Sequence, residues 1–265
     1  MWNPDDADFE PWQRMNLPED KKLGIYYNGQ FHEEEDGTIL IPGFYKGPVK
    51  GDENNKYSKV TVLRCKFNGA DLQYIEHGTI HSINEERGLH EPSIVRLGVK
   101  YFMTIRHDLR AYVTSSEDGL HYNELKPWCY DDGEQLGNYK TQQKWLKHKD
   151  TLYLVYNRES KLNNGVFRSR APLFIAEVDT DRLVVIRKTE KIVFPEKGAR
   201  MGNFSIANVT NNESWVVTGE WLMGTFSHSK KGDRFWVDWN DANYNQYIGD
   251  LLLARVYWNE SRNRK

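Results

Sequence analysis

The feature of this sequence that most restricts its fold is the alternation of short strand-like runs with tight turns. The runs are mostly about four to eight residues long and rich in Val, Ile, Tyr, Phe and Thr, which suit a pleated sheet. Turn signals such as Asn68-Gly69 and Asp179-Thr180-Asp181 separate them. Long helical periodicity is nearly absent, and only residues 138–148 are compatible with a short helix as well as a strand. The pattern predicts a meander of antiparallel hairpins, with strands at residues 24–31, 38–44, 59–67, 72–77, 93–97, 101–106, 111–115, 142–146, 151–157, 173–178, 183–188, 205–209, 214–220 and 251–257.

Similar hairpin units recur at a spacing of about 50 residues, beginning near Gly24, Glu91, Gln142 and Asn203. Repeats of this length are typical of propeller blades arranged around a central channel. We therefore expect an all-β protein, a β-propeller of about five four-stranded antiparallel blades, with six blades or an incomplete ring as alternatives. A β-sandwich is the main structural rival. No linker rich in Pro, Gly or Ser divides the 265 residues, so residues 1–265 are expected to form a single domain.

The charge and cysteine content restrict the partners. The 36 Lys and Arg residues nearly balance the 38 Asp and Glu residues, so neither nucleic acid nor a membrane surface is expected as a partner. Cys65 and Cys129 fit no CxxC pattern, and no ligand spacing demands a metal, although the acidic loops leave a structural calcium open. No cofactor is expected, and nothing in the sequence indicates an oligomeric state. The N-terminus lacks the apolar core of a signal peptide, so we expect a cytoplasmic protein unless an N-terminal extension has been lost.

One hairpin turn carries a recognisable motif. The run Ser116-Glu117-Asp118-Gly119-Leu120-His121-Tyr122 resembles a shortened Asp-box, S-x-D-G-x-x-aromatic. In such a turn the Asp accepts hydrogen bonds from backbone N–H groups, and the Gly takes a conformation that other residues resist. The resemblance implies that this turn braces the outside of a blade. We therefore do not expect Asp118 in the active site.

Several further segments strengthen this resemblance, which runs from about Gly24 to Trp221. Together they resemble the bacterial sialidase-like, or exo-α-sialidase-like, proteins of the Asp-box (BNR-repeat) superfamily. Those proteins are generally longer at the N-terminus, so this chain is expected to begin partway into their pattern. The resemblance implies a propeller fold and an activity on glycans, although fold alone does not fix function. The matching segments are RGLHEPS (87–93), TIRHD (104–108), YDDG (130–133), NYKTQQ (138–143), RSRAPLF (168–174) and GARMGNF (198–204).

Arginines at strand ends and in loops are the first candidates for binding. A guanidinium group binds a carboxylate through a bidentate fork, and converging forks would hold an acidic sugar such as a sialic or uronic acid. The alternative is that these arginines pair with nearby carboxylates of the sheet. The candidates are Arg87, Arg106, Arg158, Arg168, Arg170 and Arg200.

The segment before the strand at residues 93–97 is the first candidate for catalysis. Pro92 excludes a regular central strand there, and the preceding residues are His90 and Glu91. A histidine of near-neutral pKa beside a carboxylate suits general acid–base chemistry. The alternative is that both side chains satisfy buried backbone groups around the proline.

The remaining catalytic candidates come from the resemblance. Sialidases use a Tyr nucleophile with a Glu partner, which implies Tyr139 with Glu91, and Asp108 stands as the best counterpart of the acid. Asp131 and Asp132 could raise one another's pKa, but a simple turn is the favoured interpretation. Gln142, Asn203 and Trp221 are expected to line the substrate-binding site with the arginines.

Three functions fit these residues. The favoured one is a glycoside hydrolase that acts at the end of an anionic glycan, with an Arg-lined central cleft. The first alternative is a carbohydrate-binding propeller without catalysis. The second is a propeller polysaccharide lyase, in which His90 or Tyr139 would remove a proton beside a uronate while arginines neutralise its acid group.

Overall fold

The computed structural model describes residues 2–3, 8–9, 15, 17, 29–46, 56–163, 166–197, 199–220 and 249–258 of the chain. Throughout this part of the chain the regular structure is almost all strand. The exceptions are two short 3-10 turns, η2 (Phe167–Ser169) and η3 (Arg187–Thr189). No helix in the described residues is long and apolar enough to cross a membrane. The expectation of an all-β protein is confirmed.

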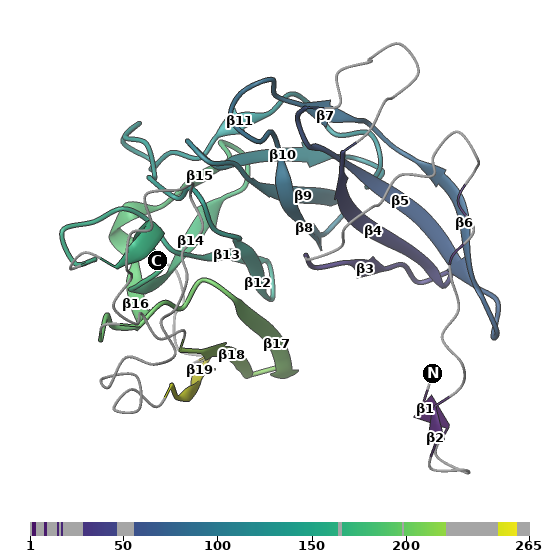
Figure 1. Cartoon of the computed structure of the whole chain (residues 1–265). Helices are drawn as coiled ribbons and strands as arrows, with labels where there is room; N and C mark the ends of the chain where they lie inside the picture. The colour runs from purple at the N-terminus through teal and green to yellow at the C-terminus, as the bar shows by residue number, and fades with distance from the viewer. Residues whose placement is uncertain are drawn as a thin grey trace, which may run out of the picture.

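The strands form four antiparallel sheets that follow one another along the chain (Figure 1), besides a two-stranded pair of β1 (Trp2–Asn3) with β2 (Asp8–Phe9). Blade 1 contains β3 (His32–Glu33), β4 (Thr38–Tyr45), β5 (Lys59–Phe67) and β6 (Leu72–His77), and β7 (His81–Ser82) also pairs with β5. Blade 2 contains β8 (His90–Leu97), β9 (Lys100–Arg106), β10 (Tyr112–Ser116) and β11 (Lys126–Pro127). Blade 3 contains β12 (Lys144–His148), β13 (Thr151–Tyr156), β14 (Leu173–Asp179) and β15 (Val184–Val185), with β16 (Lys191–Phe194) paired to β14. Blade 4 contains β17 (Phe204–Thr210), β18 (Glu213–Gly219) and β19 (Leu251–Tyr257).

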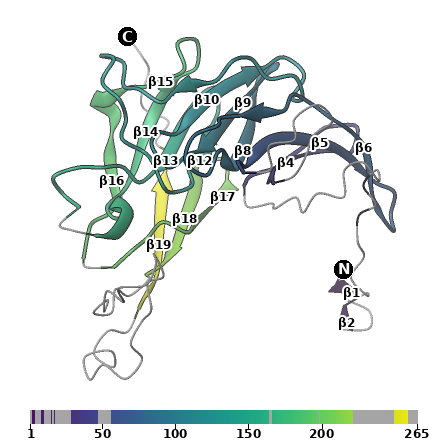
Figure 2. The ribbon, with the colours of Figure 1, turned by 45° about the horizontal axis from the view of Figure 1, so that its top comes forward.

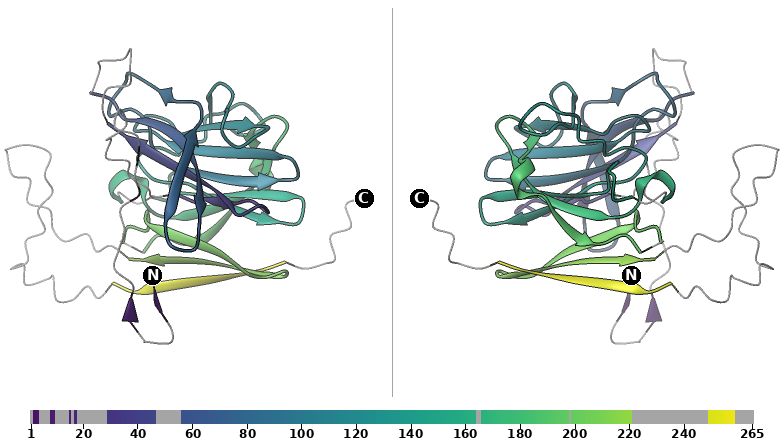
Figure 3. Two further views of the ribbon diagram at one scale, coloured as in Figure 1. Left: turned by 90° about the vertical axis from the view of Figure 1, so that its right-hand side faces the viewer. Right: turned by 90° about the vertical axis from the view of Figure 1, so that its left-hand side faces the viewer.

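The four blades are arranged as in a β-propeller. Strand β8 contacts β4 on one side and β12 on the other, and β12 contacts β17, so successive sheets meet through their inner strands. Figure 2 shows the sheets arranged around the strands β4, β8, β12 and β17, through which they meet. Figure 3 shows β19, in yellow, at the outer edge of blade 4. The arrangement confirms a propeller and not the β-sandwich considered as its rival. The described residues hold four blades, so the expected five or six are not confirmed.

Three apolar clusters fill the spaces between blades. One lies between blades 1 and 2 around Leu40 and Met103, one between blades 2 and 3 around Trp128 and Trp145, and one between blades 3 and 4. The rings of Trp128 and Trp145 pack with their centroids 5.7 Å apart. Trp145 belongs to the second cluster and its neighbour Leu146 to the third. Because consecutive residues of a strand point to opposite faces, one short strand here holds two cores together.

This packing determines the secondary structure of two segments whose sequence pattern was ambiguous. The helix considered for residues 138–148 is wrong, because β12 must present Trp145 and Leu146 to opposite sides, which a strand does and a helix does not. The strand predicted at 183–188 is largely wrong, because β15 ends at Val185 and η3 follows. Most of the strand predicted at 24–31 falls outside the described residues.

The Ser116–Tyr122 turn forms as its motif predicts. The Asp118 Oδ1 atom accepts hydrogen bonds from the backbone N–H groups of Leu120 (2.9 Å) and His121 (2.7 Å), and Gly119 has φ +75°. The turn joins the outer strands of blade 2 and reaches blade 1, where the N–H of Thr79 donates to the Leu120 carbonyl at 3.0 Å. It therefore braces two blades and lies away from the inner strands.

Candidate functional site

The candidate site lies where the inner strands begin. Blades 2, 3 and 4 each start with their innermost strand, so the loops that lead into β8, β12 and β17 lie at one end of the propeller axis. Glu91, Gln142 and Asn203 occupy these three positions. The repeat observed in the sequence therefore marked the correct end of three blades.

Glu91 is held in an unusual backbone conformation at the start of β8. Its φ is +46°, and the pairing register of β8 with β9 shifts between His90 and Ser93. The Glu91 Oε2 atom accepts a hydrogen bond from Arg106 Nη1 at 2.8 Å, and both side chains are largely buried. A left-handed conformation costs a non-glycine residue free energy and is concentrated at functional sites. The bulge therefore places a largely buried, ion-paired carboxylate at the start of the inner strand of blade 2.

Asp108 is bound by a bidentate arginine. Arg87 donates from Nε to Oδ2 at 2.5 Å and from Nη2 to Oδ1 at 2.6 Å, and Arg106 Nη2 lies 4.0 Å from Oδ1. Burial acts to raise the pKa of Asp108, but the hydrogen bond and charge of Arg87 outweigh burial and lower it. A general acid needs a raised pKa. A lowered pKa does not favour the general-acid role expected for Asp108.

His90 is buried beside the same groups. Burial, followed by the charges of Arg87 and Arg106, lowers the pKa of His90 to about 4, which differs from the near-neutral value expected from the sequence. The imidazole is therefore neutral at physiological pH, and it packs edge-on against Phe44 at 5.2 Å. Within the described part of the chain its Nε2 atom has no hydrogen-bond partner. A neutral imidazole can accept a proton, whereas the imidazolium form that acts as a general acid is disfavoured in this position.

A second group of arginines approaches from blade 3 and from the loop into β17. Burial, then the charges of Arg106 and Arg168, lower the pKa of Arg170 to about 10. Burial, then Arg106 and Arg87, likewise lower the pKa of Arg168, and burial followed by Arg168 lowers that of Arg200. The charges of neighbouring arginines therefore act on one another across the site, while the charge of Glu91 opposes their effect on Arg170.

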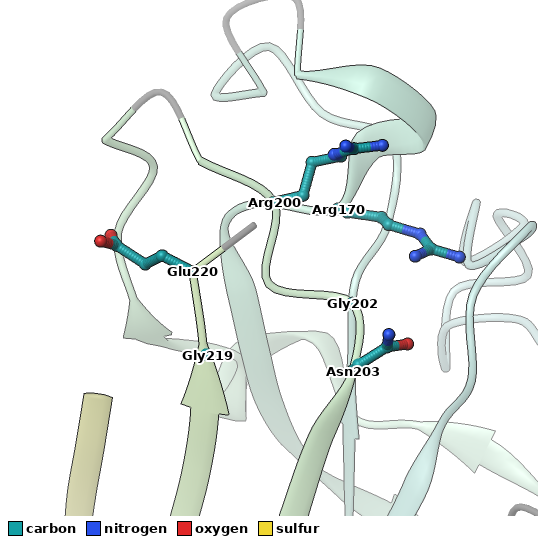
Figure 4. Close-up of a pocket in the computed structure, with 6 residues that line it drawn as sticks. All are labelled: Arg170, Arg200, Gly202, Asn203, Gly219 and Glu220. Atoms are coloured by element: carbon teal, nitrogen blue, oxygen red, sulfur yellow. The ribbon is translucent and has the colours of Figure 1, made fainter. Parts of the chain in front are cut away.

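A cavity opens beside this second group. Its volume is about 150 Å³, and its lining lies between blades 3 and 4 (Figure 4). In Figure 4 the guanidinium groups of Arg170 and Arg200 and the amide of Asn203 extend to one side, while the Glu220 carboxylate points the opposite way. The lining residues are Arg170, Arg200, Gly202, Asn203, Gly219 and Glu220.

Left-handed backbone is concentrated around the site. Besides Glu91, the residues Lys140, Arg168 and Ser169 have φ of +59°, +57° and +52°. Lys140 lies in the loop before β12, and the other two lie in η2 before β14. Strain of this kind persists where the surrounding structure imposes it, and it marks candidate functional loops.

Two expected site residues take other positions, and a third cannot be placed. Arg158 is committed to Glu190, to which it donates from Nη2 at 2.6 Å and from Nε at 2.9 Å. Burial and then the charge of Glu159 raise the pKa of Tyr139, so its carboxylate neighbour is Glu159 and not Glu91 as expected. Trp221 lies outside the described residues.

Gln142 and the acidic pair Asp131-Asp132 are also placed by the structure. Gln142 is buried, and its Nε2 atom lies 3.5 Å from the Phe204 carbonyl, so it lies beneath the start of β17. Asp132 pairs with Arg187 at 2.6 Å on the surface, as the favoured turn interpretation implies. Neither aspartate of that pair lies with Glu91 or Arg170 in the contacts that the structure gives.

Sequence reasoning missed Lys144 and Gln30. Lys144 begins β12, and burial lowers its pKa while the charge of Glu91 opposes that shift, which places its ammonium group near Glu91. It lies two residues after Gln142, so the same argument from inner-strand starts could have found it. Gln30 lies in a segment for which the sequence carried no chemical signal. Among the described residues no group of three or more His, Cys, Asp or Glu side chains could hold a metal ion.

The fold resembles solved glycoside hydrolases, whereas the sequence resembles no known family model and no curated protein. The GH43_1 enzyme from Xanthomonas citri aligns with a TM-score of 0.52 and 11% identity, over 74% of this chain and 67% of that one. A xylan β-1,4-xylosidase from Bacillus halodurans C-125 aligns with a TM-score of 0.52 and 7% identity, over 75% of this chain and 37% of that one. The GH32 β-fructofuranosidase BmSUC1 from Bombyx mori aligns with a TM-score of 0.50 and 10% identity, over 74% and 43%.

These similarities define the class of fold. At such low identity they establish a β-propeller of the kind found in glycoside hydrolases and do not by themselves establish an activity. The chain spans less than half the length of the xylosidase and of the fructofuranosidase. The similar structures named here are GH43 and GH32 proteins, and none of them is called a sialidase.

Proposed function

We propose that this protein is a propeller glycoside hydrolase that acts on an anionic glycan containing sialic or uronic acid. The observation that carries the proposal is the buried guanidinium group of Arg170, which lines a cavity together with Arg200 and whose pKa is lowered by burial and then by the charges of Arg106, Arg168 and Arg200. Clustered cations are costly unless an anion joins them. A bound acidic sugar would supply that anion, and it would be held through guanidinium forks.

Glu91 is the proposed catalytic carboxylate. It lies at the start of an inner strand, keeps a left-handed backbone and accepts a hydrogen bond from Arg106. Hydrolysis of a glycosidic bond as the reaction class is supported by the names of the similar structures, a xylosidase and a fructofuranosidase. The narrower likeness to sialidases with their Asp-boxes stays part of the proposal, as does a complete ring of about five blades. If a tyrosine nucleophile operates here, Tyr139 with Glu159 is the pair that the contacts favour.

A panel of fluorogenic glycosides tests the proposal. We expect aglycone release from α-sialosides or uronides and not from β-xylosides or β-fructosides. Glu91→Gln should lower the rate at least 100-fold, in line with about 10² for loss of a positioned acid–base group. Glu124→Gln, which changes an exposed carboxylate of blade 2, serves as the matched control. Full turnover in Glu91→Gln, or release only from neutral glycosides, would contradict the assignment.

One observation favours a polysaccharide lyase as the second candidate. His90 is neutral with a pKa of about 4 and lies among arginines that could neutralise a uronate, as a proton-abstracting base requires. A lyase would produce a 4,5-unsaturated uronate, which absorbs ultraviolet light, without consuming water. An absorbance rise on polyuronates that His90→Gln abolishes would replace hydrolysis with elimination. Binding of glycans without either product would leave the carbohydrate-binding alternative.

A further inference from the structure

The cavity between blades 3 and 4 is separate from the Glu91 cluster. Arg170 comes from the loop before β14, Arg200 and Asn203 from the loop into β17, and Glu220 follows β18. None of the lining residues comes from blade 2, which supplies Glu91, Arg106 and Asp108. The cavity is therefore lined by blades 3 and 4 alone, next to the blade 2 cluster, whose Arg106 and Glu91 charges act on Arg170.

The arginines of blade 2 already have anionic partners. Arg87 holds both oxygens of Asp108 at 2.5 and 2.6 Å, and Arg106 holds Glu91 at 2.8 Å. A ligand carboxylate would have to displace one of these carboxylates before it could use the same fork. Arg87 and Arg106 are therefore positioning residues for Asp108 and Glu91.

Arg170 is in a different situation. It is 8% exposed, and in the described part of the molecule its Nε atom has no hydrogen-bond partner. Among the residues that the structure describes, its Nη2 atom makes one long contact of 3.4 Å, to the Lys140 carbonyl. Burying a guanidinium group without an anion is costly, so a site that retains one is arranged for an anion that arrives from outside.

The cavity is shaped to keep this guanidinium in place. A Cβ atom on Gly202 would lie 2.6 Å from Cδ and 2.9 Å from Nε of Arg170, so the absence of a side chain there makes room for the arginine. Glu220 does not neutralise it, because its carboxylate points away in Figure 4 and its Oε2 atom accepts from the N–H of Asp250 at 3.2 Å. Asn203 extends its amide to the same side as Arg170 and can supply a second donor.

We propose that this cavity binds the carboxylate of one terminal acidic sugar and that Arg170 is the residue that selects it over a neutral sugar. The inference rests on the proposed function, whose ligand class it makes specific. The volume of about 150 Å³ corresponds to about five water molecules at about 30 Å³ each, which suits a carboxylate with part of one ring and not an oligosaccharide. A guanidinium fork binds carboxylates and tetrahedral oxyanions alike, so the assignment to a carboxylate rests on the proposed acidic-sugar substrate and is tested against a sulfated sugar.

Calorimetric binding of single sugars tests the proposal. The probes are D-glucuronate, N-acetylneuraminate, D-glucose and D-glucose 6-sulfate, with the wild type and the variants Arg170→Met, Arg170→Lys and Gly202→Ala. We expect the wild type to prefer an acidic sugar to glucose by at least about tenfold, and Arg170→Met to lose that preference. Gly202→Ala should weaken acid binding without removing any charge, because it displaces the arginine. Arg182→Met, at an exposed site in blade 3, is the control and should keep the preference.

The outcomes separate this inference from the proposed function. If Arg170→Met is folded and keeps the wild-type preference for acidic sugars, the inference is wrong although the hydrolase proposal stands. If the wild type binds and cleaves only neutral sugars, or none, the proposed function fails first. Equal Arg170-dependent binding of glucose 6-sulfate and glucuronate would overturn the assignment to a carboxylate. Circular dichroism of each variant shows whether it is folded before binding is interpreted.

Discussion

Gln30 and Trp145, which are 115 residues apart in the sequence, are joined by two reciprocal hydrogen bonds. The Gln30 Nε2 atom donates to the Trp145 carbonyl at 2.7 Å, and the Trp145 N–H donates to Gln30 Oε1 at 2.6 Å. The Gln30 carbonyl also accepts from the N–H of Ile94 at 3.0 Å. Gln30, just before β3, therefore ties blade 2 to blade 3, with its backbone carbonyl bound to one and its side chain to the other.

Replacing this glutamine should destabilise the fold. We expect Gln30→Leu to lower the free energy of unfolding by about 1–3 kcal/mol, because it leaves a backbone N–H and a carbonyl of β12 without partners. Urea denaturation measures the change. Gln73→Leu, at an exposed position of β6, is the matched control and should change stability by less than about 0.5 kcal/mol. An equal effect of both substitutions would contradict the bridging role of Gln30.

Removing only one partner of the Arg106–Glu91 pair should lower the free energy of unfolding more than replacing both partners. Arg106→Met removes one partner of a largely buried ion pair and should cost about 3–5 kcal/mol, because the Glu91 carboxylate is left buried without its partner. The double variant Arg106→Met with Glu91→Gln should recover part of this loss. A double-mutant cycle measured by denaturation gives the coupling energy. Additive effects would mean that the two side chains act independently.

Glu190 should stabilise the protein through a pH-dependent network. It accepts hydrogen bonds from Tyr130 (2.6 Å) and Tyr156 (2.5 Å) and from Arg158. Burial acts to raise its pKa, but Arg158 and the two tyrosines lower it below the ordinary 4.5. A carboxyl group whose pKa is lowered on folding contributes stability above its unfolded pKa, and this is lost as the pH falls through the folded value.

The expected result is that acid unfolding of wild type begins below about pH 4.5, and that Glu190→Gln is already destabilised at neutral pH and loses less on acidification. Arg158→Met should also destabilise the fold while it leaves sugar binding unchanged, since Arg158 is occupied by Glu190. Thermal unfolding across a pH series, with binding measured at neutral pH, checks both points. A loss of binding in folded Arg158→Met would restore Arg158 to the ligand site.

His90 should make the free energy of unfolding depend on pH in a range above that of Glu190. Its pKa falls from 6.5 to about 4 on folding, so the unfolded chain binds more protons between these values. Stability is then fully present above about pH 6.5 and decreases as the pH falls toward 4. His90→Gln should flatten the stability profile in this window, whereas His121→Gln, in the exposed turn of blade 2, should not. An unchanged profile in His90→Gln would mean that another group titrates there.

The local pattern of hydrophobic runs and turns was sufficient to predict most of the strands. The strands Lys59–Phe67, Leu72–His77 and Leu251–Tyr257 begin and end where the hydrophobic runs predicted. The repeat that placed Glu91, Gln142 and Asn203 at blade starts is also local, since each blade opens with its inner strand. These features depend on alternation and turns, which short stretches of sequence determine.

The partners of charged side chains could not be predicted in this way. Arg158 was grouped with the site arginines, but its partner Glu190 lies 32 residues away and meets it only after blade 3 has formed. The Tyr139–Glu91 pair failed for the same reason, because Glu159 lies closer to Tyr139 in the folded loop. Arg170 has space because Gly202 carries no side chain, and it is not paired with Glu220 because that carboxylate points away. No local sequence pattern predicts either feature.

The left-handed residues around the site limit how it could be redesigned. At Glu91, Lys140, Arg168 and Ser169 the backbone has positive φ, which Gly, Asn and Asp tolerate and β-branched residues resist. A library that changes sugar preference would therefore yield more folded members if it offered Asn, Asp or Gly at these four positions. Wider chemical variety belongs at Asn203, whose exposed side chain at the mouth of the cavity carries no such backbone constraint.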